Sequence, residues 1–264
     1  MTLISHAAEK AVRVALLSDP HVTFKTNGAS ATYGPHFEQT IAAVNAANVD
    51  VVLIAGDLGN EGKVEEWQAF KAYVKKIKAP VFYVPGNHDV GHKFNSGKKN
   101  GTITPERVQN YETNMGPSFF AESKAGLRII GLNSSLMGSG FSREKEQWDF
   151  LEQQLAKTNP VPTVVFMHYP LFLKTVDEAG GIYFNTEPEP RKRLLSLLHQ
   201  GGVKTVLTGH LHQNLVKRDN GILLISTEPI SFGIPAGKQP EGWTLVTIPT
   251  EGEATFEVKN LASH

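Results

Sequence analysis

Residues 81–89 read VFYVPGNHD. Val81–Val84 is a short apolar run of residues that favour β-strands, and a proline and a glycine end it. Asn87, His88 and Asp89, which are residue types suited to metal binding, follow at once. We therefore predict a buried strand over residues 81–84 with a chemically active loop at its carboxyl end.

Four more apolar runs end in polar residues of the same kinds. These runs and their polar residues are Val12–Leu17 with Asp19 and His21, Val51–Ala55 with Asp57, Val164–Met167 with His168, and Val203–Leu207 with His210 and His212. Ligands of α/β proteins bind beyond the carboxyl ends of parallel strands. A single Asp or His after a strand more often caps a loop than binds a ligand, but five such strand ends together indicate one site.

The segments between these runs indicate an α/β protein. Helical spacing in residues 37–47 and 61–77 separates the first three predicted strands, and this βαβαβ rhythm predicts parallel pairing with helices on both faces of the sheet. Further helices are predicted over 105–114, 142–156 (with Ser142 as N-cap) and 190–199, and further strands over 128–132, 214–218, 222–226 and 243–248.

Other local signals complete the outline of the chain. Asp219-Asn220-Gly221 predicts a hairpin between two of the late strands. Residues 171–188 predict a long irregular loop of a length that is usually functional or mobile. Without an internal repeat or a linker, we expect one domain over residues 1–264.

Composition excludes several classes of function. The chain has no cysteine, which excludes thiolate metal sites, disulfides and cysteine nucleophiles. It has 26 basic and 26 acidic residues, so it lacks the basic excess of a nucleic-acid-binding protein. No apolar run approaches the roughly 20 residues that a membrane-spanning helix needs. The sequence does not decide the oligomeric state.

The first ten residues bear on location. Met1–Lys10 lacks the basic and long apolar regions of an intact signal peptide, although His6–Lys10 is compatible with the remnant of a cleaved one. We favour a soluble, cytoplasmic protein, with a processed secreted or periplasmic form as the alternative.

The spacing and chemistry of the polar residues predict a metal site. Asp19 and His21, like His210 and His212, are separated by one residue, and residues i and i+2 of an extended chain point the same way, so each pair is expected to reach one ion. Carboxylate, imidazole and amide ligands without thiolates suit Mn, Fe or Zn. Glycines that allow a tight turn or a close approach precede three of the polar groups, at Gly56, Gly86 and Gly209.

The order of these groups resembles the calcineurin-like metallophosphoesterase superfamily. The matching motifs are Asp19-x-His21, Gly56-Asp57, Gly86-Asn87-His88-Asp89, His168 and Gly209-His210-x-His212. Segments around them look like the subgroup named "calcineurin-like phosphoesterase domain-containing", whose animal members are described as protein phosphatases. The resemblance implies an α/β fold of four layers, a two-sheet β-sandwich flanked by helices.

The resemblance also implies a role for each position. Two divalent or mixed-valence metal ions would be bound, the first by Asp19, His21 and His212 and the second by Asn87, His168 and His210. Asp57 would bridge them. His88 would face the substrate without binding metal, and Asp89 would orient His88.

The function implied is hydrolysis of a phosphoric ester by a metal-bridging hydroxide that attacks phosphorus in line. We favour a phosphomonoester as substrate. A phosphodiesterase acting on cyclic nucleotides or other diesters is the alternative, because residues 56–62, GDLGNEG, lack the arginine of the large protein phosphatases and look more like diesterases. A non-catalytic binding scaffold is the second alternative, and the completeness of the motifs argues against it.

Overall fold

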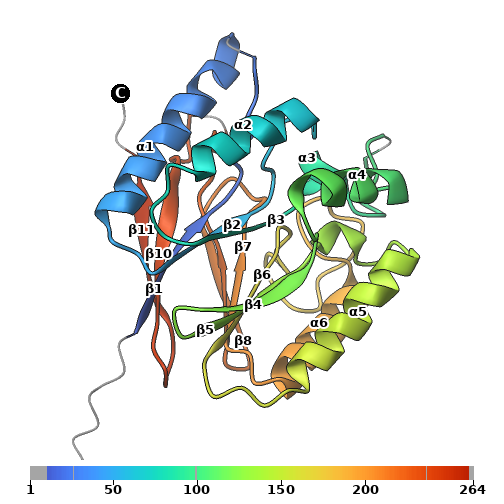
Figure 1. The fold of residues 1–264 in the computed structure, drawn as a ribbon. Helices are drawn as coiled ribbons and strands as arrows, with labels where there is room; N and C mark the ends of the chain where they lie inside the picture. Colours follow the sequence, from blue (N-terminus) through green and yellow to red (C-terminus); the bar gives the residue numbers. More distant parts are fainter. Residues whose placement is uncertain (1–10, 26, 99, 236, 262–264) are drawn as a thin grey trace, which may run out of the picture.

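The structure, a computed structural model, describes residues 11–25, 27–98, 100–235 and 237–261. Its strands form two sheets, one of five strands in the order β11-β10-β1-β2-β3 and one of six in the order β4-β5-β6-β7-β9-β8 (Figure 1). The strands are β1 (Val12–Leu17), β2 (Val51–Ala55), β3 (Val81–Val84), β4 (Phe120–Lys124), β5 (Leu127–Gly131), β6 (Thr163–Phe166), β7 (Thr205–Thr208), β8 (Leu215–Asp219), β9 (Ile222–Ser226), β10 (Gly242–Ile248) and β11 (Thr255–Asn260).

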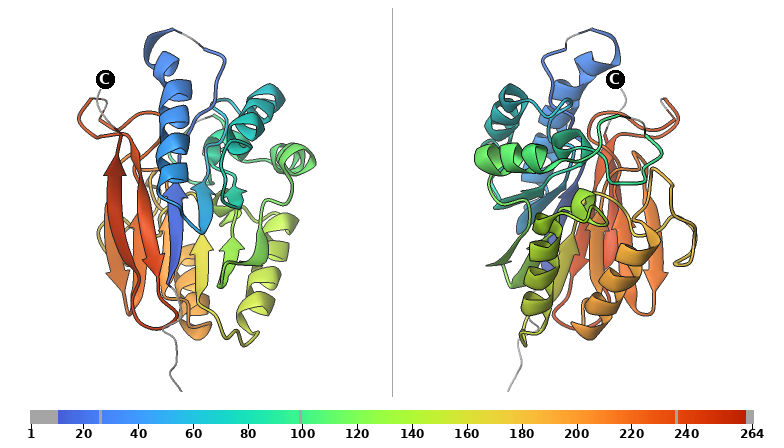
Figure 2. Two further views of the ribbon diagram at one scale, coloured as in Figure 1. Left: turned by 60° about the vertical axis from the view of Figure 1, so that its left-hand side comes forward. Right: turned by 90° about the vertical axis from the view of Figure 1, so that its right-hand side faces the viewer.

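Helices cover the outer face of each sheet, with α1 and α2 beside the first and α5 and α6 beside the second (Figures 1 and 2). The helices are α1 (Tyr33–Ala46), α2 (Val64–Val74), α3 (Asn87–Val90), α4 (Pro105–Met115), α5 (Ser142–Leu155) and α6 (Pro188–Gln200), with short 3-10 turns at Gly28–Thr32 and Ser134–Leu136. Parallel pairing of β1 with β2 and of β2 with β3 is confirmed.

The alternation of side chains in the strands explains the layers. In β1, Val14 and Leu16 belong to an apolar cluster that draws on both sheets, whereas Ala15 and Leu17 belong to the cluster that includes Phe37 of α1. Each sheet therefore packs on helices with one face and on the other sheet with its second face. The expectation of helices on both faces of one sheet was wrong, and the two-sheet sandwich implied by the resemblance is correct.

The predicted elements differ from the structure mainly at the sheet edges. β1, β2, β3 and β9 have the predicted bounds, and β8 and β9 form the predicted antiparallel hairpin. Two strands were not predicted, β4 and β11, and both lie at an edge of their sheet with most side chains exposed or half-buried. An edge strand needs no apolar run, so its sequence gives little signal. Ser142 is the first residue of α5, and Phe141 takes the cap position without a side-chain bond.

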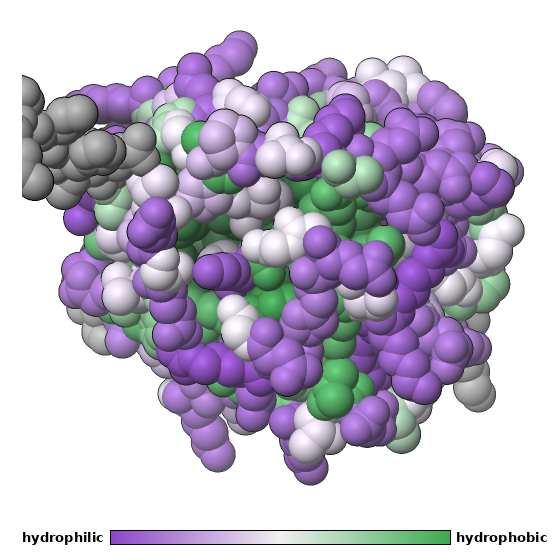
Figure 3. Space-filling model, turned by 90° about the horizontal axis from the view of Figure 1, so that it is seen from below, coloured by the Kyte–Doolittle hydropathy of each residue, from purple (hydrophilic) through white to green (hydrophobic). Residues whose placement is uncertain are grey.

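The two ends of the sandwich differ in chemistry. At the end of the sandwich where β6 and β7 begin, a groove of about 460 Å³ runs between Pro160, Lys204 and Pro249. The face seen from below has apolar side chains at the bottom of a hollow (Figure 3). None of the predicted ligands lines the groove. In the described part of the chain, no helix is long and apolar enough to cross a membrane. The expectation about residues 1–10 lies outside the described residues.

Candidate metal centre

The predicted ligands lie at the carboxyl ends of β1, β2, β3, β6 and β7, as expected. Two glycines allow the strand ends to meet. A Cβ atom at Gly86 would lie 2.1 Å from Asp57 Oδ1, and one at Gly209 would lie 1.6 Å from Ser18 Oγ. Any side chain at these positions would force the loops apart, so glycine is required for the site to close.

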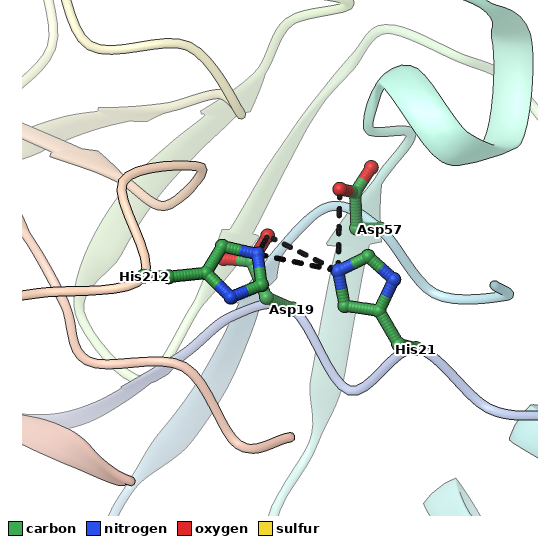
Figure 4. A group of neighbouring side chains, drawn as sticks. All are labelled: Asp19, His21, Asp57 and His212. Carbon is green, nitrogen blue, oxygen red and sulfur yellow. Dashed lines mark hydrogen bonds and ion pairs between the residues drawn. The ribbon is translucent and has the colours of Figure 1, made fainter. Parts of the chain in front are cut away.

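Six side chains form two clusters that share Asp57. The first contains Asp19, His21, Asp57 and His212 (Figure 4). The second contains Asp57, His168 and His210. Every member is buried, and within each cluster the candidate ligand atoms lie within 4.8 Å of one another. The two oxygens of Asp57 divide between the clusters, because Oδ2 lies 3.5 Å from His21 Nε2 and Oδ1 lies 3.4 Å from His168 Nε2.

Asn87 completes the second cluster. Its Oδ1 lies 3.0 Å from His168 Nε2, while its Nδ2 points away and donates to the hydroxyl of Tyr183 over 3.3 Å. The amide oxygen, which can bind a metal ion, therefore faces the cluster. All seven predicted ligands are thus brought together. Four form the first cluster, and the other three, Asn87, His168 and His210, surround the second site together with the shared Asp57.

The expected geometry of the paired residues was partly wrong. Asp19 and His21 do share a cluster, but His210 and His212 divide between the two. The backbone at these residues is not extended, because φ is 53° at Asp19, 44° at His21, 70° at His210 and 53° at His212. Left-handed backbone at residues other than glycine costs on the order of 1–3 kcal/mol each and is typical of functional sites.

Backbone carbonyls fix the orientation of three imidazoles. Nδ1 of His168 donates to Ala55 O over 2.7 Å, and Nδ1 of His212 donates to Phe232 O over 2.6 Å. His210 uses Nε2 instead, which donates to Tyr183 O over 3.2 Å. A carbonyl accepts only from N–H, so in the neutral form of each ring it is the other nitrogen that carries a lone pair and faces the cluster. This is the usual arrangement around a histidine that binds a metal.

Unsatisfied atoms support the same interpretation. Asp19 Oδ1 and His21 Nδ1 are buried without a hydrogen-bond partner among the described residues. Inner nitrogens also face each other, since His21 Nε2 lies 3.3 Å from His212 Nε2 and His168 Nε2 lies 3.1 Å from His210 Nδ1. Such groups are costly to bury unless something satisfies them. The donor set and its geometry therefore fit two metal ions.

The charges of the pocket favour a bound cation. Burial acts to raise the pKa of Asp19 and of Asp57, but the neighbouring imidazoles, chiefly His212 and His168, bring both pKa values well below their usual range. Burial lowers the pKa of His21 to about 3, which keeps this ring neutral. For His168 burial has the same effect, yet Asp57 prevails and raises its pKa to about 9. Two buried carboxylates thus attract positive charge to this site.

His88 lies beside the clusters but outside them, as expected. Its ring centroid is 4.5 Å from that of His21, and its backbone N–H donates to Asp57 Oδ1 over 2.8 Å. Nδ1 donates to the backbone carbonyl of Asn60 over 2.6 Å, and within the described part of the chain no hydrogen bond engages Nε2. Sequence reasoning missed Asn60, because every residue has a carbonyl and no side-chain signal marks this one.

No hydrogen bond among the described residues joins Asp89 to His88, which it was expected to orient. The Asp89 carboxylate accepts four hydrogen bonds, from the backbone N–H groups of Leu58, Gly59 and Gly86 and from Trp67 Nε1. Asp89 therefore joins the loop after β2 to the loop after β3. Burial raises its pKa to about 6, with Asp57 acting in the same direction and the N–H donors opposing both.

A two-sheet α/β sandwich with adjoining Asp and His clusters at one end defines the metallophosphoesterase class. A family model described as "Calcineurin-like phosphoesterase" matches residues 12–214. The chain therefore belongs to the calcineurin-like phosphoesterase family and is a metal-dependent phosphoesterase. This family uses a dinuclear metal centre.

Similar proteins differ in what they are named for. The chain is 27% identical over 231 residues to the serine/threonine-protein phosphatase CPPED1 of Homo sapiens, covering 81% of this chain and 69% of that protein. It is 24% identical over 277 residues to the 3',5'-cyclic adenosine monophosphate phosphodiesterase CpdA of Vibrio vulnificus, covering 97% and 92%. The purple acid phosphatase PPD1 of yellow lupin has the same fold, with a TM-score of 0.66 at 18% identity over 95% of this chain and 51% of that one.

Proposed function

We propose that this chain is a phosphomonoesterase that would hold two metal ions, with Asp57 as a ligand to both. The observation that carries the proposal is the division of the Asp57 carboxylate, one oxygen toward each cluster. Asp19, His21 and His212 would hold the first metal, and Asn87, His168 and His210 the second. The metals, when bound, would lower the pKa of water and polarise the phosphoryl oxygens. Mn, Fe and Zn suit these ligands.

His88 supplies the proton that the reaction needs. As water adds to phosphorus, the bond from phosphorus to the leaving oxygen breaks and that oxygen takes a proton from Nε2 of protonated His88. The carbonyl of Asn60 holds Nδ1, so the ring presents Nε2 in one orientation. The positive charge of His88 also stabilises negative charge that develops on the phosphoryl group.

Charge favours a monoester as the substrate. Among the described residues, only Asp19 and Asp57 bring carboxylates into the clusters, since the Asp89 carboxylate is held by four N–H donors. Two divalent ions would therefore leave the site net positive, and a dianionic monoester gains more from this than a monoanionic diester. The 27% identity to a protein named as a phosphatase agrees with this choice.

A diesterase that acts on cyclic nucleotides is the second candidate. Phe184 is 36% exposed with its ring centroid 5.8 Å from that of His210, so an aromatic surface for a nucleobase lies beside the second cluster. The similarity to a cyclic AMP phosphodiesterase covers 97% of the chain. Residues 56–62 contain no arginine, the residue type that holds terminal phosphate oxygens bidentately in the large protein phosphatases, and this agrees with a diester substrate.

The test is a comparison of kcat/KM for nitrophenyl phosphate, bis-nitrophenyl phosphate and cyclic AMP with the same metal and pH. We expect the monoester to be preferred. A diester or cyclic AMP that wins by more than about tenfold, or 1.4 kcal/mol in transition-state stabilisation, would reject the monoester and favour the second candidate. A metal-loaded protein that hydrolyses none of the three would favour a binding scaffold.

A further inference from the structure

Tyr183 contacts two ligands of the second cluster at once. It lies in the long loop between β6 and α6, and its hydroxyl accepts a hydrogen bond from Asn87 Nδ2 over 3.3 Å. Its backbone carbonyl accepts a second from His210 Nε2 over 3.2 Å. Its ring lies against the same histidine, with 4.9 Å between the centroids. Asn87 and His210 follow strands of different sheets, so this loop residue links the two sides of the cluster.

The two hydrogen bonds decide which atoms face the cluster. An amide binds a metal through oxygen and not through its NH₂ group, so Asn87 is a ligand only in the orientation that its bond to Tyr183 favours. In this orientation Oδ1 lies 3.0 Å from His168 Nε2. The carbonyl of Tyr183 likewise requires N–H at Nε2 of His210, which leaves the lone pair on Nδ1, 3.1 Å from His168 Nε2.

The first cluster does not depend on this loop. The ring of His212 is fixed by Phe232 O, and the backbone N–H of His210 holds Asp19 Oδ2 over 3.0 Å. Among the described residues, Tyr183 has no hydrogen bond or ring contact with the ligands of the first cluster. A change at its hydroxyl should therefore affect the two metal sites unequally.

The loop that carries Tyr183 is tied to the rest of the protein. Thr186 binds Pro170 O twice, through its backbone N–H at 2.9 Å and its hydroxyl at 3.0 Å. Glu187 accepts from the backbone N–H of Gly181 at 3.1 Å and from buried Lys93. Lys98 Nζ lies 4.6 Å from the centroid of the Tyr183 ring. These contacts fix the loop before and after Tyr183, and Lys98 also contacts the ring itself.

We propose that Tyr183 is a positioning residue of the second metal site, acting through the amide orientation of Asn87 and the tautomer of His210. The inference rests on the proposed two-metal function. Its hydroxyl keeps the amide oxygen of Asn87 turned inward, and partners of this kind typically change metal affinity about 10- to 100-fold when they are removed.

The experiment compares Tyr183→Phe with Tyr169→Phe in the full chain. Tyr169 is a matched control because its ring centroid lies 4.2 Å from that of His210 while its hydroxyl forms no hydrogen bond with any ligand. Calorimetric titration with Mn²⁺ should give two equivalents for the wild type and for Tyr169→Phe. In Tyr183→Phe the first equivalent should bind as in the wild type and the second about 10- to 100-fold more weakly. Equal melting temperatures of the metal-free proteins would show that the fold is unchanged.

Activity gives a second readout. With limiting Mn²⁺ the kcat of Tyr183→Phe should fall, and excess Mn²⁺ should restore it, because a positioning residue acts only through occupancy of the site. A wild type that binds one equivalent would reject the two-metal function and this role with it. Two equivalents in the wild type and an unchanged second affinity in Tyr183→Phe would reject the role of Tyr183 alone. So would a kcat that stays low when both sites are filled, since the hydroxyl would then act on the substrate directly.

Discussion

The imidazole of His88 donates a hydrogen bond from Nδ1 to the backbone carbonyl of Asn60 over 2.6 Å. This contact sets the direction of Nε2 without drawing on any acidic side chain. The carbonyl therefore orients the ring so that Nε2 is the nitrogen available to a leaving oxygen. The arrangement leads to a specific expectation for the reaction.

Replacement of His88 by alanine should leave metal binding intact and slow turnover. We expect a loss of roughly 10²–10⁴ in kcat for an alkyl phosphate, the usual size of a general-acid contribution. Nitrophenolate leaves without a proton, so the loss for nitrophenyl phosphate should be smaller. Single-turnover rates of the two substrates with metal-saturated protein measure the difference. An equal loss on both would assign His88 to phosphate binding.

Loss of Asp57 should weaken both metal sites. Each oxygen of this carboxylate faces a different cluster, so Asp57→Ala removes a ligand from both, whereas Asp19→Ala removes one from the first cluster only. Elemental analysis after dialysis should give the lowest metal content for Asp57→Ala and about one ion for Asp19→Ala. Two tightly held ions in Asp57→Ala would contradict the bridging role.

Asp89 should matter for stability more than for proton transfer. In Asp89→Asn an NH₂ group would replace one oxygen and face two N–H donors, which should cost about 3 kcal/mol in the free energy of unfolding. Trp67→Phe deletes one donor and should cost less. Urea unfolding of the metal-free variants provides the values. If Asp89→Asn keeps its stability but changes leaving-group dependence as His88→Ala does, Asp89 does orient His88.

Replacing Glu187 should cost more free energy of unfolding than replacing Lys93, its partner in a buried ion pair. The Lys93 side chain is 1% exposed and that of Glu187 is 13% exposed. Glu187→Gln leaves a buried lysine without its counterion and should cost about 3 kcal/mol or more. Lys93→Met should cost less, because Glu187 keeps its bond to Gly181. In chemical unfolding, the double variant should be more stable than Glu187→Gln alone, and additive losses would argue against an ionic interaction.

The buried Glu228 should make stability depend on pH. Burial raises the pKa of this carboxyl, against the opposing effect of hydrogen bonds from the hydroxyls of Thr227 and Thr244. A folded-state pKa above the unfolded value stabilises the protein at low pH, and this contribution is lost as pH rises through the folded pKa. The melting temperature of Glu228→Gln minus that of the wild type should therefore increase as the pH is raised from 4 to 8. A constant difference across this range would show that Glu228 does not titrate.

Sequence alone predicts this site well where the signal is local. The ligands at residues 19, 57, 87, 168 and 210 each follow an apolar run directly, so strand and ligand are visible in one window of sequence. Asn60 accepts from His88, 28 positions away, and Tyr183 accepts from His210, 27 positions away. In both contacts the acceptor is a backbone carbonyl, which every residue has. Such partners appear only when the chain is folded.

The backbone of the site shows a second limit. An extended strand end is the natural expectation after an apolar run, yet Asp19, His21, His210 and His212 adopt left-handed φ. Their conformation is imposed by other segments, for example by the hydrogen bonds from Asp19 N to Gly56 O and from Ser231 N to Asp19 O. Propensity describes a residue in isolation and does not include forces of this kind.

The two sheets each supply residues to both clusters, so metal ions bound there would link one sheet to the other. The first sheet supplies Asp57, which both clusters share. The second sheet supplies His212 to the first cluster and His168 and His210 to the second. A shift of one sheet against the other by about an ångström would separate the ligands. Metal binding should therefore fix the position of one sheet relative to the other. Conversely, a substitution in the apolar layer between the sheets, such as Phe166→Leu, should weaken metal binding at a distance before it unfolds the protein.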